Sequence, residues 1–141
     1  MTDLVISNGT PIILGNSADY NPTAGTALTG TRTGQLNLAS LAAAAYRQSD
    51  KFDFGATRAA RYFCRAAFAM STGPVAYGTF EIFIAFSDSA TAANNNPGNL
   101  SGADSAYNGY GAAATDADEA VGQLTRVGHV VVSNDNDVMV G

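Results

Sequence analysis

The clearest pattern in the chain is the alternation of residue types from Thr79 to Phe86. Apolar residues at every second position give this segment one fully apolar face: Phe80, Ile82, Ile84 and Phe86. The opposite face is mixed, as in a strand with one side on a core. Valine-rich runs at 127–132 and 138–140, separated by the turn-forming residues 133–137, predict two further strands.

The segment 61–70 is compatible with two structures. As a strand it places Tyr62 and Cys64 on one face with Phe68; as a helix it aligns Arg58, Arg61 and Arg65 in a stripe. We favour the strand because aromatic residues and cysteine pack well in sheets, and because Gly73-Pro74 ends the run as a turn.

Weaker alternation at 36–40 and at 51–54 predicts two short, half-buried strands. Between them, the run 41–46 contains four consecutive alanines. Helix propensity favours a helix there, whereas the flanking alternation favours a strand. Both interpretations remain open for this run.

Residues 1–34 form an extended N-terminal segment in this interpretation. The short apolar runs 4–7 and 11–14 are joined by Asn8-Gly9, which suits a tight turn, so they are a hairpin or an arm. The remainder, 15–34, is rich in Gly, Thr, Asn and Ala and is typical of an extended surface segment.

Residues 87–118 read as one long loop whose only large apolar side chains are Leu100, Tyr107 and Tyr110. Such a segment is either disordered in isolation or ordered by a partner, and we expect the partner, with the two tyrosines as contact residues. The alternative is that the loop folds over its own domain with both tyrosines as internal lids.

One short helix is predicted at the end of this segment. The apolar residues there fall at helical spacing: Ala117, Ala120, Val121 and Leu124.

Together these elements predict an all-β fold. A length of 141 residues fits a single domain, and several short strands with turn signals predict an antiparallel β-sandwich of jelly-roll type with long loops and one short helix.

Charge is sparse and segregated. Charged residues make up 13% of the chain and the net charge is −5. The segment 47–65 carries five of the seven bases against two acids, and residues 66–141 carry eight acids against Arg126 alone. This argues against nucleic-acid binding and favours docking of the basic segment on acidic protein, with Arg47, Arg58, Arg61 and Arg65 as contacts. The alternative is that these arginines only solvate one face.

The ends and the apolar runs predict no secretion signal and no membrane span. The first residues carry an acid where a signal peptide needs positive charge, and no apolar run approaches the ~20 residues of a membrane helix. Cys64, in an apolar segment, is expected to be a buried thiol of a protein folded in a reducing cytoplasm.

Catalytic chemistry is poorly represented. With one Cys and one His, the chain has no internal disulfide, Cys/His zinc cluster or multi-histidine site. His129 lies among valines and is expected to be structural. The GxGxxA pattern at 109–114 follows a polar loop rather than a strand, which argues against nucleotide binding. We therefore expect no enzyme activity, cofactor or metal.

Three short segments resemble small structural proteins of tailed phages. They are Arg47-Gln-Ser-Asp-Lys-Phe-Asp-Phe-Gly-Ala-Thr-Arg58, Asn96-Pro-Gly-Asn-Leu-Ser-Gly-Ala-Asp104 and Tyr107-Asn-Gly-Tyr110. In length and β-rich pattern the chain looks most like the cement, or capsid decoration, proteins of short-tailed double-stranded-DNA phages, with the likeness spanning about 36–132.

That resemblance implies a jelly roll that sits as a homodimer or other homo-oligomer on the capsid exterior. The implied partner is the major capsid protein, and the implied setting is a virion assembled in the host cytoplasm. The expected function is non-enzymatic stabilisation of the head. A phage tail-associated structural protein and a carbohydrate-binding surface module, for which the aromatic pair Tyr107 and Tyr110 offers a platform, are the alternatives.

Overall fold

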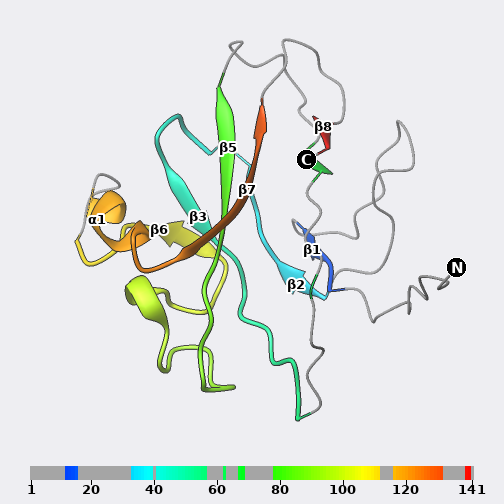
Figure 1. Cartoon of the computed structure of the whole chain (residues 1–141), viewed down its shortest axis with the longest axis vertical. Helices are drawn as coiled ribbons and strands as arrows, with labels where there is room; N and C mark the ends of the chain where they lie inside the picture. The colour runs from blue at the N-terminus through cyan, green and yellow to red at the C-terminus, as the bar shows by residue number, and fades with distance from the viewer. Residues whose placement is uncertain are drawn as a thin grey trace, which may run out of the picture.

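The structure, a computed structural model, describes residues 12–15, 33–39, 41–56, 62, 67–68, 78–111, 116–131 and 139–140. Strands dominate, and one short α-helix and one 3-10 turn accompany them (Figure 1). In chain order the elements are β1 (Leu14–Gly15), β2 (Gly34–Gln35), β3 (Tyr46–Gln48), β4 (Ala67–Phe68), β5 (Thr79–Ile84), η1 (Pro97–Asn99), β6 (Ser105–Tyr107), α1 (Ala117–Val121), β7 (Thr125–Val131) and β8 (Met139–Val140). The all-β prediction with one short helix is confirmed at this level.

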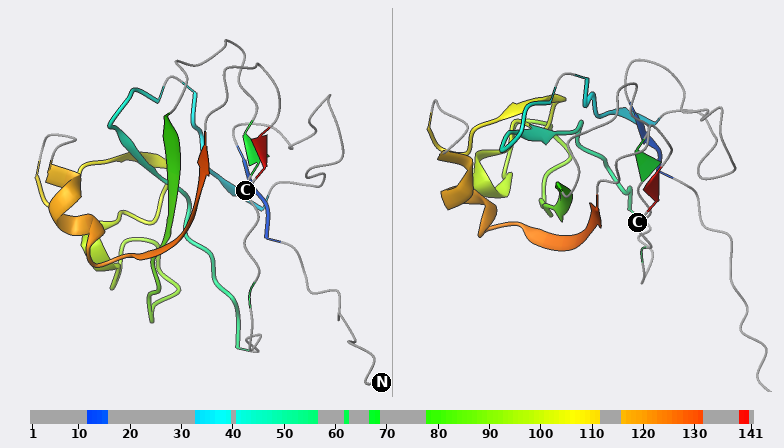
Figure 2. Two further views of the ribbon diagram at one scale, coloured as in Figure 1. Left: turned by 45° about the horizontal axis from the view of Figure 1, so that its top comes forward. Right: turned by 90° about the horizontal axis from the view of Figure 1, so that it is seen from above.

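The strands of the described part pair two by two. β3 with β6, β4 with β8 and β5 with β7 are antiparallel, whereas β1 and β2 run parallel. Seen from above, the β3–β6 and β5–β7 pairs form two layers (Figure 2, right). The parallel β1–β2 pair departs from the purely antiparallel pairing that the sequence predicted.

The β5–β7 pair is the longest ladder, and it confirms both the strand predicted from alternation at 79–86 and the strand predicted from the valine-rich run at 127–132. β5 ends at Ile84, two residues before the predicted end, and β7 spans Thr125–Val131 rather than 127–132. Thr79 pairs with Val131 at one end and Ile84 with Thr125 at the other, with a bulge after Ile82. The more buried face consists of alternate residues: Phe80, Ile82, Ile84 and Val130.

The strands predicted at 36–40 and 51–54 are wrong for the described residues of these segments. The backbone N–H groups of Asn37 and Ala39 are bonded to side-chain oxygens rather than to a ladder. Lys51 makes one backbone bond, to the carbonyl of Gly102, and no strand continues from it. Strand β3 instead begins at Tyr46, because the run before it is a turn, neither helix nor strand, with Ala44 at φ 57°.

The long loop predicted at 87–118 contains regular structure. It holds η1 and β6, and β6 pairs with β3 over three residue pairs. The helix predicted from the spacing of Ala117 and Ala120 is present as α1. The start of α1 packs closely against the backbone at position 109, and this position requires glycine. Gly109 has φ 62°, and a Cβ there would lie 2.6 Å from the carbonyl oxygen of Asp116.

A small apolar cluster joins this region to β3. Tyr107, Ala117 and Ala120 are its buried members. Half-buried side chains pack against them: Tyr46, Leu100, Val121 and Leu124. The segment 87–118 thus contributes to the interior of the molecule.

Several other predictions fall wholly or partly outside the described residues. Of the strand predicted at 61–70, only Tyr62 and β4 are described, and β4 pairs with β8. The turns at Asn8-Gly9, Gly73-Pro74 and 133–137 lie outside the described ranges. Within those ranges, no helix is long and apolar enough to cross a membrane.

Candidate interaction surface

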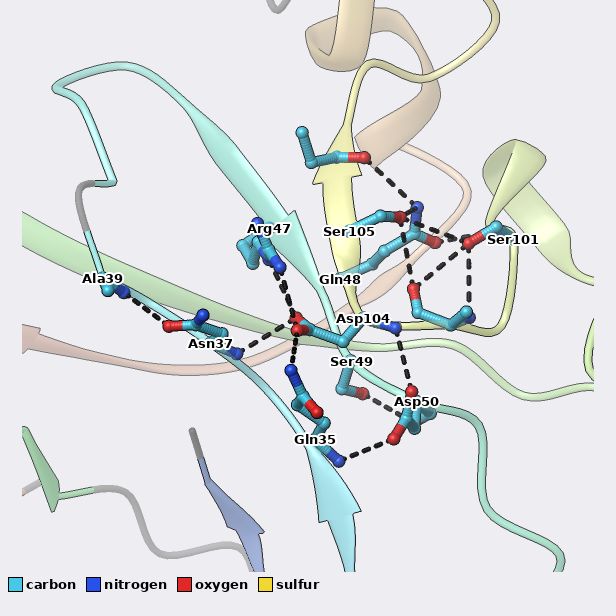
Figure 3. Close-up of polar contacts among 12 residues, drawn as sticks. Gln35, Asn37, Ala39, Arg47, Gln48, Ser49, Asp50, Ser101, Asp104 and Ser105 are labelled. Carbon is cyan, nitrogen blue, oxygen red and sulfur yellow. Dashed lines mark hydrogen bonds and ion pairs between the residues drawn. The ribbon is translucent and has the colours of Figure 1, made fainter. Parts of the chain in front are cut away.

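Arg47, predicted as an interface residue, is bound within its own chain. It lies on β3, and its Nε and Nη2 atoms donate to Oδ1 and Oδ2 of Asp104 at 2.8 and 2.9 Å (Figure 3). The side chain of Asp104 is only 5% exposed and that of Arg47 is 25% exposed. The guanidinium holds the pKa of Asp104 below its ordinary value, and the carboxylate raises the pKa of Arg47.

The carboxylate of Asp104 also accepts hydrogen bonds from β2 and from the segment that follows it. The backbone N–H of Asn37 donates to Oδ1 at 3.0 Å, and the side chain of Gln35 donates to Oδ2 at 2.9 Å. A second carboxylate, Asp50, accepts the backbone N–H groups of Gln35 and Asp104 at 2.7 and 2.9 Å. The two acids therefore join three chain segments through groups that irregular backbone would otherwise leave unsatisfied.

Gln48 completes this polar network on the β3–β6 ribbon. Its Oε1 accepts the backbone N–H of Ser101 at 2.7 Å, and its Nε2 donates to Ser105 Oγ at 2.8 Å. Gln48 is 9% exposed. The network is structural, and sequence reasoning missed it because its members are far apart in the chain.

Lys51 fixes the first part of the segment 87–118. Its ammonium lies within hydrogen-bond distance of four oxygen atoms: Ser87 Oγ at 2.8 Å, Thr91 O at 3.0 Å, Asn94 O at 2.9 Å and Asn96 Oδ1 at 2.8 Å. An ammonium has three protons, so one proton is shared between acceptors. The chain's only lysine thus orders this segment from within the molecule.

The two tyrosines predicted as contact residues have different environments. Tyr107 is 3% exposed, its hydroxyl donates to the carbonyl of Gly98, and burial raises its pKa. Tyr110 is 63% exposed, and its hydroxyl donates to Gln123 Oε1 at 2.9 Å. In the folded chain Tyr107 therefore behaves as the internal lid of the alternative interpretation, while Tyr110 remains at the surface.

The other predicted contacts, Arg58, Arg61 and Arg65, lie outside the described residues, as does Cys64. Tyr107 pairs with Tyr46, the neighbour of Arg47, so Arg47 and Tyr107 share the β3–β6 ribbon. Alternation along a strand places these two side chains on opposite faces. The structure thus does not bring them together in one patch.

The exposed face of the β5–β7 pair is a surface that sequence reasoning did not single out. Val127 and Val131 are 41% and 56% exposed on β7. Glu81 and Arg126 form an ion pair at 2.9 Å, with side chains 46% and 52% exposed. His129, expected to be structural, is also exposed here and is paired in register with Glu81. The alternation of Val127, His129 and Val131 is the signal that marks this face.

The bulge sets the composition of this face. Ile82 pairs with Gly128 and Phe83 with Arg126, so Val127 is the extra residue on β7. An extra residue exchanges the faces of the positions that follow it. Arg126 therefore lies on the same side as Glu81, which explains their ion pair.

Two observations on the described residues concern metal ions and small molecules. No group of three or more His, Cys, Asp or Glu side chains lies there in a geometry that would hold a metal ion. An open pocket of about 200 Å³ lies beside Arg47, and half of the residues that line it are alanines. This is smaller than the roughly 300–1,000 Å³ of typical ligand pockets.

Comparison with known proteins adds no relative. The chain matches no protein-family model, and no curated protein or solved structure is significantly similar to it.

Proposed function

We propose that the chain is a non-enzymatic structural protein of a phage virion that binds the outer surface of the capsid and stabilises the head. Its partners in this proposal are the major capsid protein and further copies of itself. The accompanying fold is a jelly-roll sandwich, for which the two layers formed by β3–β6 and β5–β7 are the structural support (Figure 2).

The observation that carries the proposal is the exposed β5–β7 face, taken with the resemblance of the segments 47–58, 96–104 and 107–110 to phage structural proteins. Exposed valines beside an exposed ion pair form a mixed apolar and charged surface. Such surfaces suit protein–protein contact, because apolar area supplies affinity and charge supplies orientation. Many weakly bound copies on one shell would act together.

The test is the location and copy number of the chain in purified particles. Quantitative mass spectrometry should find it in a fixed ratio to the major capsid protein, and cryo-electron microscopy should find it on the outside of the head. Particles stripped of the chain should break at a lower temperature than intact particles. A chain found only in tails would support the tail-associated alternative, and a chain absent from particles would refute both.

A carbohydrate-binding module remains the second candidate, now on different residues. Tyr107 is buried and cannot join Tyr110 in a platform. Phe54 and Tyr62, however, are 39% and 50% exposed, and their ring centroids are 4.8 Å apart. If this pair binds sugar, Phe54→Ala should abolish retardation of the chain in gels containing polysaccharide, while Tyr110→Ala should leave it unchanged.

A further inference from the structure

We propose that the exposed face of the β5–β7 pair is a self-association surface, on which a second copy of this chain packs face to face around a two-fold axis parallel to the strands. We call this surface the β5–β7 face. Its exposed residues on the two strands are Thr79, Glu81, Arg126, Val127, His129 and Val131, and the half-buried Phe83 lies on the same side. The inference deepens the proposed function by naming the surface through which copies of the chain meet.

The distribution of charge on this face favours a second copy as its occupant. The acid, Glu81, lies on β5, whereas the base, Arg126, lies on β7 together with the imidazole ring of His129. A two-fold axis parallel to the strands places β5 of one copy over β7 of the other at the same height. Glu81 of each copy then lies opposite His129 of the other copy and within reach of the long Arg126 side chain.

The same operation covers an exposed apolar residue. Thr79 and Val131 are paired in register, so the axis places Val131 of each copy on Thr79 of the other. Val131, 56% exposed in the single chain, would then lose contact with water. A two-fold interface makes every contact twice, which doubles the effect of each complementary pair.

The size of the face limits the strength of this contact. Two strands of six paired residues cover an area of about 200–300 Å². A standard interface buries about 800 Å² on each partner. We therefore expect dimerisation at high protein concentration in solution, and efficient dimerisation only where copies are held close together, as on a shell.

The test exploits the two-fold symmetry through charge-reversed variants of the full chain. Glu81→Arg and Arg126→Glu should each weaken dimerisation by about ten-fold or more in sedimentation equilibrium, because like charges then face one another. An equimolar mixture of the two variants should associate as well as the wild type, since each carries the charges that the other lacks. The double variant Glu81→Arg plus Arg126→Glu should also dimerise.

Glu119→Arg is the matched control, because it reverses an exposed acid on α1 rather than on the face. It should leave dimerisation within about two-fold of the wild type. Circular dichroism of every variant shows whether the fold is intact, and rescue in the mixture cannot arise from misfolded chains. Wild type that stays monomeric across about a hundred-fold range of concentration overturns the inference.

Two further outcomes would also overturn it. If Glu119→Arg weakens dimerisation as strongly as Glu81→Arg, the effect is one of net charge and not of this face. If the wild type is monomeric but Val131→Asp loses binding to stripped particles, the face belongs to the shell protein. That second result would leave the proposed capsid function standing.

Discussion

The carboxylate of Asp104 accepts four hydrogen bonds, and no pattern in the sequence predicts this role. It receives two donors from Arg47, one from Gln35 and one from Asn37. A nearly buried carboxylate with four donors is stabilised in its charged form. Removal of this charge should therefore weaken the contacts of all three segments that Asp104 joins.

Replacement of Asp104 by Asn should destabilise the fold by about 1–3 kcal/mol at pH 7, because it removes the ion pair and leaves donors unmatched. In the folded chain the pKa of Asp104 lies below its ordinary value. Its contribution is therefore complete above the unfolded pKa of about 3.9 and is lost as the pH falls through the lower folded pKa. Urea unfolding at several pH values measures both effects.

The matched control for this prediction is Asp88→Asn. Asp88 is exposed and accepts only a bond from the exposed Asn95 side chain among the described contacts. Its replacement should change stability by less than about 0.5 kcal/mol at every pH. Equal losses in both variants would show that the Asp104 network does not support the fold.

Lys51 gives a second prediction at the scale of single residues. Lys51→Met should increase the rate of amide hydrogen exchange across 87–96, because four oxygen atoms lose their common donor. Lys51→Arg should not restore protection, since a planar guanidinium does not fit where a compact ammonium did. Unchanged exchange in Lys51→Met would show that the segment is ordered by other contacts.

Among the elements, periodicity predicted the strands and the helix that have a strong local signal. β5 has apolar residues at every second position, β7 is rich in valine, and α1 has apolar residues at helical spacing. β6 was missed because Ser105–Tyr107 lies in a polar, glycine-rich segment and owes its strand conformation to pairing with β3. Tertiary contacts of this kind leave no periodic signal.

The candidate site was less predictable than the fold. The sequence places Arg47 in a basic segment, but its partner Asp104 is 57 positions away, and no spacing rule connects the two residues. Tyr107 is one of the few large apolar residues of its segment, but its burial depends on α1 packing over β6. The pairing of Arg126 with Glu81 on one face follows from the bulge, which the sequence does not reveal.

The contrast between Tyr107 and Tyr110 is testable at the scale of the apolar cluster. Tyr107→Ala should destabilise the isolated chain by about 3 kcal/mol or more, since it removes a buried ring. Tyr110→Ala should cost less than about 1 kcal/mol, because that ring is already exposed. Thermal unfolding of the two single variants separates them, and equal losses would contradict the structural assignment.

Tyr46 links β3 to α1 and makes this junction sensitive to alkaline pH. Its hydroxyl donates to Asp118, and this bond, with burial, raises the pKa of Tyr46 to about 12. Because the folded pKa exceeds the unfolded value of about 10, the stabilisation is complete below pH 10 and is lost as the pH rises towards 12. Wild type should therefore lose stability relative to Tyr46→Phe over that range. Parallel unfolding curves at all pH values would exclude the linkage.

For the whole molecule, the described residues indicate a fold held by polar networks more than by a large core. Their buried apolar side chains are Tyr107, Ala117, Ala120 and Val130, and no large side chain among them is fully buried. Buried apolar area determines the heat-capacity change of unfolding. An average protein of 141 residues would show about 1.7–2.1 kcal/mol/K.

We expect calorimetry of the isolated chain to give a heat-capacity change below about 1.5 kcal/mol/K, because less apolar surface is exposed on unfolding. If the chain binds stripped particles as proposed, this binding should also show a negative heat-capacity change, because apolar surface is then buried. The control is the Val131→Asp variant. It should have the same heat-capacity change of unfolding as the wild type, but a smaller heat-capacity change of binding if the β5–β7 face is buried on the particle. A value at or above the average for the free chain would contradict the view that polar networks stabilise this fold more than apolar burial does.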